Sequence, residues 1–208
     1  MIRIPGSPVT SKETSPSLAA IVAAVDGELP DFRAQTSPEG MLTIAFTDIE
    51  GSTAMLERMG EERWFKLMMD HNTMVQECVT SHCGEVVKSQ GDGFMVVFSS
   101  SSAALAWAVD LQWILAKHNS APAEEPLRVR IGLHTGNIFQ ADHDFFGKAV
   151  VLAARITGHA RGGQVLVSGA CRDYTLRSGR WRYGPQRDLK LKGLAGPERV
   201  YRLDWTKC

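Results

Sequence analysis

Apolar and polar residues alternate with a period of two near residue 42, where Leu42, Ile44 and Phe46 are the apolar positions. This alternation is typical of a β-strand with one buried face. The same pattern predicts further strands at 86–87, 94–98, 127–134 and 164–168, and β-rich pieces around Trp181 and 200–203. The chain therefore contains enough strands for a sheet.

Between these strands, apolar residues recur every three to four positions, which predicts helices at about 54–81, 101–117 and 150–159. The methionine-rich side of the first helix is more typical of core filling than of a cofactor site. A sheet with helices packed on it defines an α+β fold, which is the class we expect.

The first strand runs into Asp48 and a turn containing Gly51, Ser52 and Thr53, whose hydroxyls suit the capping of a helix beginning near Ala54. A carboxylate beside a helix N-terminus can hold a divalent cation and phosphate oxygens. The same residue types are also common in turns and caps, so a purely structural role is the alternative.

A second carboxylate, Asp92, lies in Gly91-Asp92-Gly93 between two strand-like runs, which predicts a hairpin. Asp-Gly turns are common without any function. A hairpin tip carrying Asp92 can also face the loop carrying Asp48, however, and two carboxylates meeting there would form a site for a hard cation.

Composition narrows the class of protein. The chain has 208 residues with 23 Lys and Arg against 23 Asp and Glu, so net charge indicates no nucleic-acid or membrane partner. It lacks an apolar run of the roughly 18–20 residues that span a membrane, and a signal-peptide pattern, so we expect a cytoplasmic protein. The cysteines, which lack zinc-ligand spacing and are expected to be reduced thiols, are Cys78, Cys83, Cys171 and Cys208.

Residues 1–40 are polar and contain Ser-Pro pairs, which predicts a flexible N-terminal extension with a short helical arm at about 18–25. Residues 41–208 then form one domain, a length ample for a substantial core.

Six ordered blocks of this domain resemble the class III nucleotidyl cyclases, the adenylyl and guanylyl cyclase family, in their bacterial adenylyl cyclase type. The blocks are FTDIEGST at 46–53, KSQGDG at 88–93, RIGLHTG at 130–136, DFFGKAVVLAARI at 144–156, GGQVLVS at 162–168 and LKGLAGPERVYRL at 191–203. The resemblance implies a ferredoxin-like βαββαβ core similar to polymerase palm domains, and an adenylate cyclase that converts ATP to 3′,5′-cyclic AMP and pyrophosphate.

The resemblance also implies two Mg²⁺ or Mn²⁺ ions per site, which neutralise charge during phosphoryl transfer. Their ligands would be Asp48, Asp92 and the backbone carbonyl of Ile49. Backbone amides of the turn containing Gly51, Ser52 and Thr53 would hold the β- and γ-phosphates. Lys192, or Lys190 as the second choice, would contact the triphosphate.

Lys88 and Asp144 match the family's base-reading positions. A lysine donor suits an unprotonated ring nitrogen of adenine, and a carboxylate acceptor suits its exocyclic amine. This pair favours ATP over GTP, although a lone lysine on a strand or a lone aspartate in a loop is more often a solvated residue.

The chain departs from the family pattern at one position. The family's charge-stabilising arginine is matched by Arg155, but Val151 stands where active members carry an asparagine that orients the ribose. Loss of one such contact commonly costs about 2.7–4 kcal/mol, or roughly 10²–10³ in rate. Low activity, or takeover of this role by another residue, is therefore expected.

In the family the site forms between two domains, so the resemblance implies a homodimer with sites shared between protomers. One alternative is a weakly active or inactive cyclase-homology domain that binds nucleotide and serves regulation, as Val151 suggests. Another is a different palm-type nucleotidyl transferase, which the absence of a GGDEF-like hairpin disfavours.

Overall fold

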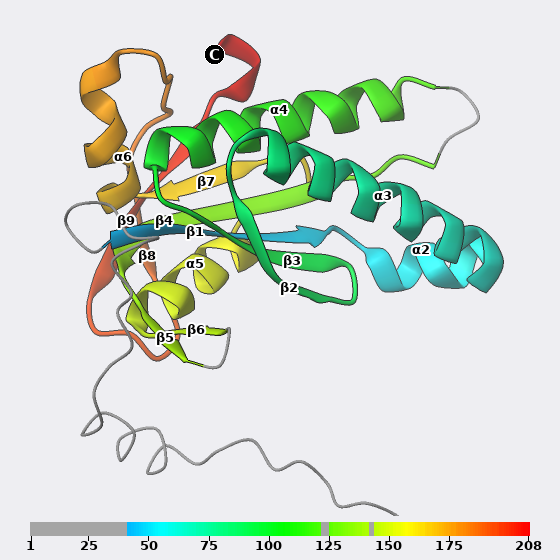
Figure 1. The fold of residues 1–208 in the computed structure, drawn as a ribbon, viewed down its shortest axis with the longest axis horizontal. Coiled ribbons are helices and arrows are strands. Elements are labelled where there is room, and N and C mark those ends of the chain that lie inside the picture. The colour runs from blue at the N-terminus through cyan, green and yellow to red at the C-terminus, as the bar shows by residue number, and fades with distance from the viewer. Residues whose placement is uncertain (1–40, 122–124, 142–143) are drawn as a thin grey trace, which may run out of the picture. The chain divides into compact units, whose positions relative to one another are not determined.

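The computed structural model describes residues 41–121, 125–141 and 144–208, and at its centre is a seven-stranded sheet (Figure 1). The strands lie in the order β2-β3-β1-β4-β7-β9-β8. Their bounds are β1 Met41–Ile49, β2 Glu85–Gln90, β3 Gly93–Phe98, β4 Val129–Asn137, β7 Val165–Ser168, β8 Arg187–Lys190 and β9 Pro197–Leu203. Strands β4 and β7 are parallel and all other neighbours are antiparallel, so the sheet is mixed.

Helices cover both faces of this sheet. Helices α3 and α4 lie on one face and α5 lies on the other (Figure 1). The bounds are α2 Ser52–Met59, α3 Glu61–Ser81, α4 Ser101–Asn119, α5 Lys148–Gly158 and α6 Gly169–Thr175, with short 3-10 helices Leu176–Ser178 and Trp205–Lys207. A separate hairpin of β5 Phe139–Ala141 and β6 Asp144–Phe146 precedes α5.

The first seven elements form the βαββαβ unit expected from the sequence, with α2 and α3 together taking the place of its first helix. The chain runs from β1 through α2 and α3 to the β2–β3 hairpin, and then through α4 to β4. Strand β1 pairs with β3 on one side and β4 on the other, both antiparallel, which gives the ferredoxin-like order β2-β3-β1-β4. The expected α+β class and ferredoxin-like core are therefore confirmed.

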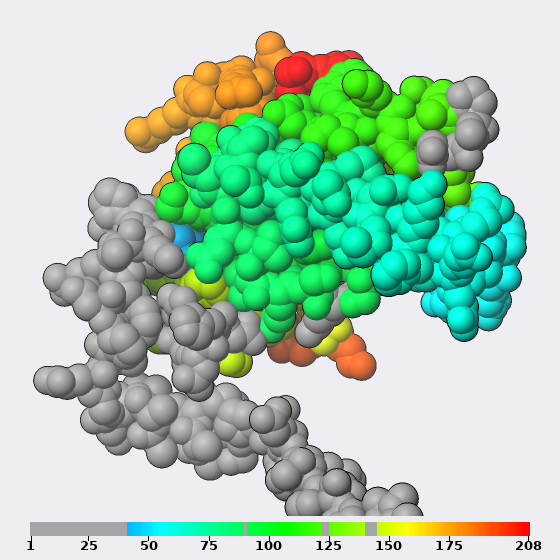
Figure 2. Space-filling view, turned by 45° about the vertical axis from the view of Figure 1, so that its right-hand side comes forward, coloured from blue at the N-terminus to red at the C-terminus, as the bar shows by residue number. Residues whose placement is uncertain are grey.

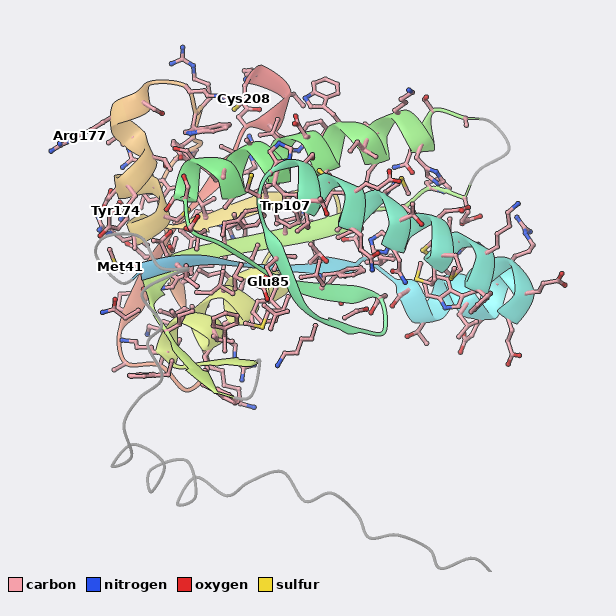
Figure 3. The ribbon with its side chains drawn as sticks, in the orientation of Figure 1. Met41, Glu85, Trp107, Tyr174, Arg177 and Cys208 are labelled. Carbon is pink, nitrogen blue, oxygen red and sulfur yellow. The ribbon has the colours of Figure 1, made fainter. Side chains whose placement is uncertain are left out.

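The period of two in β1 divides its side chains between two cores. Ala45 and Ile49 join the large cluster under α3 and α4, where Trp107 is fully buried between α4 and the sheet (Figure 3). Leu42 and Ile44 point to the opposite face and pack against α5. In the space-filling view, the side chains of α3 form a continuous surface with those of α4, and α2 lies at one end of it (Figure 2).

The structure corrects several expected elements. One helix was expected over 54–81, but Gly60, with φ of 83°, separates α2 from α3. A positive φ is accessible to glycine at little cost, so the chain turns there. Helix α2 begins at Ser52, and its N-cap is Gly51 with no side-chain hydrogen bond, so the predicted hydroxyl cap is wrong. The strand expected around Trp181 is limited to a bridge between Tyr183 and Leu203.

Three other expectations concern the rest of the chain. The predicted extension at 1–40, with its helical arm, lies outside the described residues. All four cysteines are free thiols, as expected. Within the described ranges, none of the helices is long and apolar enough to cross a membrane.

Candidate functional site

The two candidate metal-binding carboxylates lie at the same end of neighbouring strands. Because β1 and β3 are antiparallel, the last residues of β1 lie beside the first residues of β3. The amide of Phe94 donates to Thr47 Oγ1 at 3.0 Å, which fixes the strands at this edge. Asp48 follows Thr47, and Asp92 precedes β3 in the hairpin turn. The topology thus places two acids that are far apart in sequence at one edge of the sheet, although their side chains line different pockets.

Asp48 is held by an arginine from the strand on its other side. Asp48 and Arg130 stand opposite each other in the β1–β4 ladder. Arg130 Nε donates to Asp48 Oδ2 at 2.6 Å, and Nη2 also contacts Oδ2. Both residues line a pocket of about 250 Å³ on the α5 face, together with Lys88 and Thr157. The candidate metal ligand and the candidate base-reading lysine therefore share one pocket.

Asp92 occupies a different environment. Its Oδ2 atom is buried and has no hydrogen-bond partner among the described residues. Asp92 lines a second pocket, of about 230 Å³, with Ser52 and Thr53 from the first turn of α2. The structure thus places two of the three expected phosphate-binding residues beside Asp92 rather than beside Asp48.

A buried histidine behind Asp92 was missed by the sequence reading. His71 on α3 is fully buried, its ring centroid lies 5.7 Å from that of Phe94, and neither ring nitrogen has a hydrogen-bond partner within the described ranges. Burial lowers the pKa of His71 to about 4, and the neighbouring Asn72 side chain and the charge of Asp92 oppose this shift only in part. His71 is neutral near pH 7. The sequence indicated only that His71 falls on the buried side of α3.

The expected phosphate-binding turn is held in place by hydrogen bonds between Glu50 and two other segments of the chain. Gly51 has φ of 73°, a conformation that favours glycine and lets α2 begin directly after β1. The amide of Glu50 donates to the Arg128 carbonyl at 2.9 Å, and Glu50 Oε1 accepts from the Gly162 amide at 3.0 Å. The Ile49 side chain is buried. The first-turn amides of α2 are those a helix leaves without internal acceptors.

The base-reading candidates come from two strands in contact. Lys88 lies in β2, and Asp144 is the first residue of β6, a strand that contacts β2. The side chain of Asp144 lies outside the described part of the structure. The backbone therefore places the two positions on adjoining strands, although they are separated by more than fifty residues in sequence.

Val151 and Arg155 lie one turn apart on the outer side of α5. Ala149, Leu152 and Ala153 face the sheet, whereas Val151 is 43% exposed and Arg155 is exposed. Ala154, Thr157 and Gly158 of the same helix line the Asp48 pocket, but Arg155 is not among its lining residues. Arg155 therefore lies beside this pocket on the surface of α5 without lining it.

The lysines expected near the triphosphate lie at the end of β8. Lys190 is the last residue of that strand, Lys192 follows the buried Leu191, and both lysines are exposed. Neither lines the Asp48 pocket or the Asp92 pocket.

The donor set suits a hard cation that also binds substrate. Across the described ranges, the structure contains no group of three or more His, Cys, Asp or Glu side chains placed to hold a metal ion. Mg²⁺ commonly uses only one or two carboxylates and completes its coordination with water and substrate phosphates. Asp48 and Asp92 each supply one such carboxylate, Asp48 from the first pocket and Asp92 from the second.

Comparison with known proteins gives consistent matches. A family profile described as the adenylate and guanylate cyclase catalytic domain matches residues 34–204. An uncharacterised protein of Mycobacterium tuberculosis is 34% identical over 172 residues, which covers 80% of this chain and 56% of that protein. An adenylate cyclase of Mycosarcoma maydis is 35% identical over 156 residues, covering 63% of this chain and 6% of that protein. The chain spans about half the length of the mycobacterial relative.

Solved structures share the fold. An adenylate cyclase of Trypanosoma brucei, described in its monomeric state, superposes with a TM-score of 0.73 at 26% identity, covering 83% of this chain and 93% of that chain. The adenylyl cyclase CyaB of P. aeruginosa superposes with a TM-score of 0.69 at 22% identity, covering 78% and 93%.

Proposed function

Since the chain belongs to the adenylate and guanylate cyclase catalytic domain family, we propose that it is an adenylyl cyclase that forms 3′,5′-cyclic AMP and pyrophosphate from ATP. The main support is one observation: Asp48 and Lys88 line the same pocket of about 250 Å³. A cation-binding carboxylate and a base-reading cation in one pocket suit a nucleoside triphosphate, which presents anionic phosphates and a polar base.

In the reaction, the ribose 3′-hydroxyl oxygen bonds to the α-phosphorus, the bond between that phosphorus and the bridging oxygen of pyrophosphate breaks, and the hydroxyl proton passes to water. Asp48, Asp92 and the Ile49 carbonyl would hold divalent cations, either Mg²⁺ or Mn²⁺. When bound, such cations neutralise phosphate charge and lower the pKa of the attacking hydroxyl. The chain's own contribution is to position the carboxylates on strand ends that the sheet holds rigid.

The phosphates would be bound by the start of α2. Amides of Gly51, Ser52 and Thr53 lie where a helix offers unsatisfied N–H groups and a partial positive charge. Ser52 and Thr53 share the second pocket with Asp92, so a phosphate there would lie beside that candidate metal ligand. Lys192 would add a positive charge from the β8 end.

Selection of the base would depend on Lys88 and Asp144. The pair offers a donor to an adenine ring nitrogen and an acceptor for the exocyclic amine, which guanine would mismatch. The contact between β2 and β6 supports their joint action. We therefore propose ATP rather than GTP as the substrate.

The exposed position of Arg155 supports a site shared between two protomers. Arg155 and Val151 lie on the outer side of α5, and Arg155 does not line the pocket that contains Asp48. In a homodimer with two equivalent sites, Arg155 of each chain would reach the carboxylates of the other. A monomer would then lack a complete site.

Val151 favours a second candidate function. A valine supplies no hydrogen bond, and it is 43% exposed on the helix face where the ribose-orienting asparagine is expected. A domain that binds nucleotide with little turnover and regulates a partner is therefore the alternative to an efficient enzyme.

The first test is cyclic AMP formation from ATP with Mn²⁺ and then Mg²⁺, with GTP in parallel and Asp48→Ala as control. Activity with ATP that Asp48→Ala abolishes is the expected result. Metal-dependent ATP binding without any product would instead favour the regulatory domain. Cyclic GMP as the main product would contradict the assignment of Lys88 and Asp144.

A mixing experiment tests the shared site. Asp48→Ala and Arg155→Ala impair different halves, so a mixed dimer retains one intact site. An equimolar mixture that exchanges subunits should recover about one quarter of the wild-type rate, because half of the dimers are mixed and each has one of two sites. No recovery above the separate variants would contradict a site shared between protomers.

A further inference from the structure

The two carboxylates of the candidate metal site differ in the partner each already has. Asp48 is engaged by Arg130, which donates through Nε at 2.6 Å and contacts the carboxylate again through Nη2. Both contacts are to the same oxygen, Oδ2. The pair therefore differs from the bidentate arginine–carboxylate pair, in which each carboxylate oxygen accepts one hydrogen bond. Asp92 Oδ2 is buried and receives no hydrogen bond from any described residue.

The register of the sheet, and not a chance surface contact, brings Asp48 and Arg130 together. Asp48 and Arg130 are direct partners in the β1–β4 ladder, and β4 is held between β1 and β7 in the middle of the sheet. Directly opposed residues on one sheet face have Cβ atoms about 4.5–5.5 Å apart, within easy reach of an arginine. Every folded chain without nucleotide therefore presents Arg130 to Asp48.

We propose that Arg130 is a positioning residue that holds Asp48 in the nucleotide-free chain and competes there with the divalent cation. The inference rests on the proposed function, in which Asp48 is a metal ligand. Two N–H groups occupy the lone pairs of Oδ2, and a nearby positive charge weakens the attraction of the carboxylate for a second cation. The ion pair therefore lowers the affinity of Asp48 for a divalent cation, and opening of the pair restores it.

The surroundings permit this exchange. About one third of each side chain is exposed, 32% for Asp48 and 33% for Arg130, and both line the pocket of about 250 Å³. The guanidinium can swing within that space without unpacking the core. Asp92 Oδ2 receives no hydrogen bond from any described residue, so the competition concerns Asp48.

Mn²⁺ binding to the full chain without nucleotide tests the proposal, measured from the electron paramagnetic resonance signal of the unbound ion. Arg130→Gln removes the competing charge and should bind Mn²⁺ about two- to five-fold more tightly than wild type, the range typical of partly exposed ion pairs. Arg130→Met keeps the apolar part of the side chain without the charge, and it should show the same gain in Mn²⁺ affinity. This second variant keeps the test valid if Arg130→Gln does not fold.

Arg128→Gln is the matched control. Arg128 is an exposed arginine just before β4, and its replacement removes the same charge without touching the Asp48 pair. Its Mn²⁺ affinity should equal that of wild type. Equal or weaker binding by both Arg130 variants would overturn the competition while leaving the metal site intact, provided that Asp48→Asn weakens binding. Unchanged binding in Asp48→Asn would overturn the metal assignment and this inference together.

Discussion

The two faces of the sheet differ in how completely they are covered. On one face, α3 and α4 bury a large continuous cluster that includes Phe98, Trp107 and Leu111, each at most 1% exposed. On the other, the single helix α5 and the β5–β6 hairpin cover two smaller clusters and leave a pocket open beside Asp48. The difference indicates that one face supplies most of the stability, whereas the other offers space for chemistry.

Strand β1 serves both faces at once. Its odd-numbered Ala45 and Ile49 anchor the large cluster, and the even-numbered Asp48 opens into the pocket. Asp48 is therefore positioned by residues of the well-packed face, although its side chain lies on the other. Changes on the two faces should accordingly separate activity from stability.

The largest effect is expected from the carboxylates. Asp48→Asn and Asp92→Asn keep side-chain size but remove the charge that a divalent cation requires. Each should lower the rate of cyclic AMP formation by at least about 10³-fold, since electrostatic stabilisation of phosphoryl transfer is lost. Urea unfolding should show a free energy of unfolding close to that of wild type. Near-normal turnover in either variant would contradict the metal assignment.

A change on the covered face should do the opposite. Leu111 on α4 is fully buried in the large cluster, so Leu111→Ala should lower the free energy of unfolding by about 2–5 kcal/mol. The rate per folded molecule, measured well below the unfolding midpoint, should remain that of wild type. A matching loss of rate in folded protein would show that the two faces are coupled more tightly than their separate cores suggest.

Local patterns in the sequence anticipated the elements that depend on neighbours along the chain. The alternation at Leu42, Ile44 and Phe46 predicted β1, and Gly91-Asp92-Gly93 predicted the β2–β3 hairpin, because both signals are short-range. The break at Gly60 was missed because apolar residues continue across it with helical spacing.

Contacts between residues that are far apart in the chain could not be predicted from the sequence. Arg130 lies 82 residues from Asp48, and only the β1–β4 register brings the two together. His71 likewise looked like one more residue of a helix, and its place behind Asp92 follows from how α3 packs on the β2–β3 hairpin. Family resemblance named the candidate ligands but not the residues that hold them.

A smaller effect is expected on the open face, at α5. Val151→Asn restores the amide that the family pattern places one turn before Arg155, and it should raise the rate of cyclic AMP formation by up to about 10²-fold. Because Val151 is 43% exposed, the free energy of unfolding should change by less than about 0.5 kcal/mol. Val151→Ala is the control, with no gain expected. An unchanged rate in Val151→Asn would mean that another group orients the ribose or that another step is limiting.

The smallest effect concerns pH, because each face buries one neutral histidine. His71 lies on α3, whereas His134 in β4 lies opposite Ile44 on the α5 face. Burial, reinforced by the charge of Lys148, lowers the pKa of His134 from 6.5 to about 4. Between these values the unfolded chain binds more protons than the folded chain, so stability is present above pH 6.5 and is lost as the pH falls toward 4. Each histidine should cost about 2 kcal/mol between pH 7 and pH 5.

Urea unfolding across this range should therefore show a shallower pH dependence for His134→Gln than for wild type, with His71 still contributing its share. His159→Gln is the control, because His159 is exposed at the end of α5 and should leave the slope unchanged. An unaltered slope in His134→Gln would mean that the α5 face admits enough water to solvate the charged imidazole. That face would then be open throughout, and not only at the pocket beside Asp48.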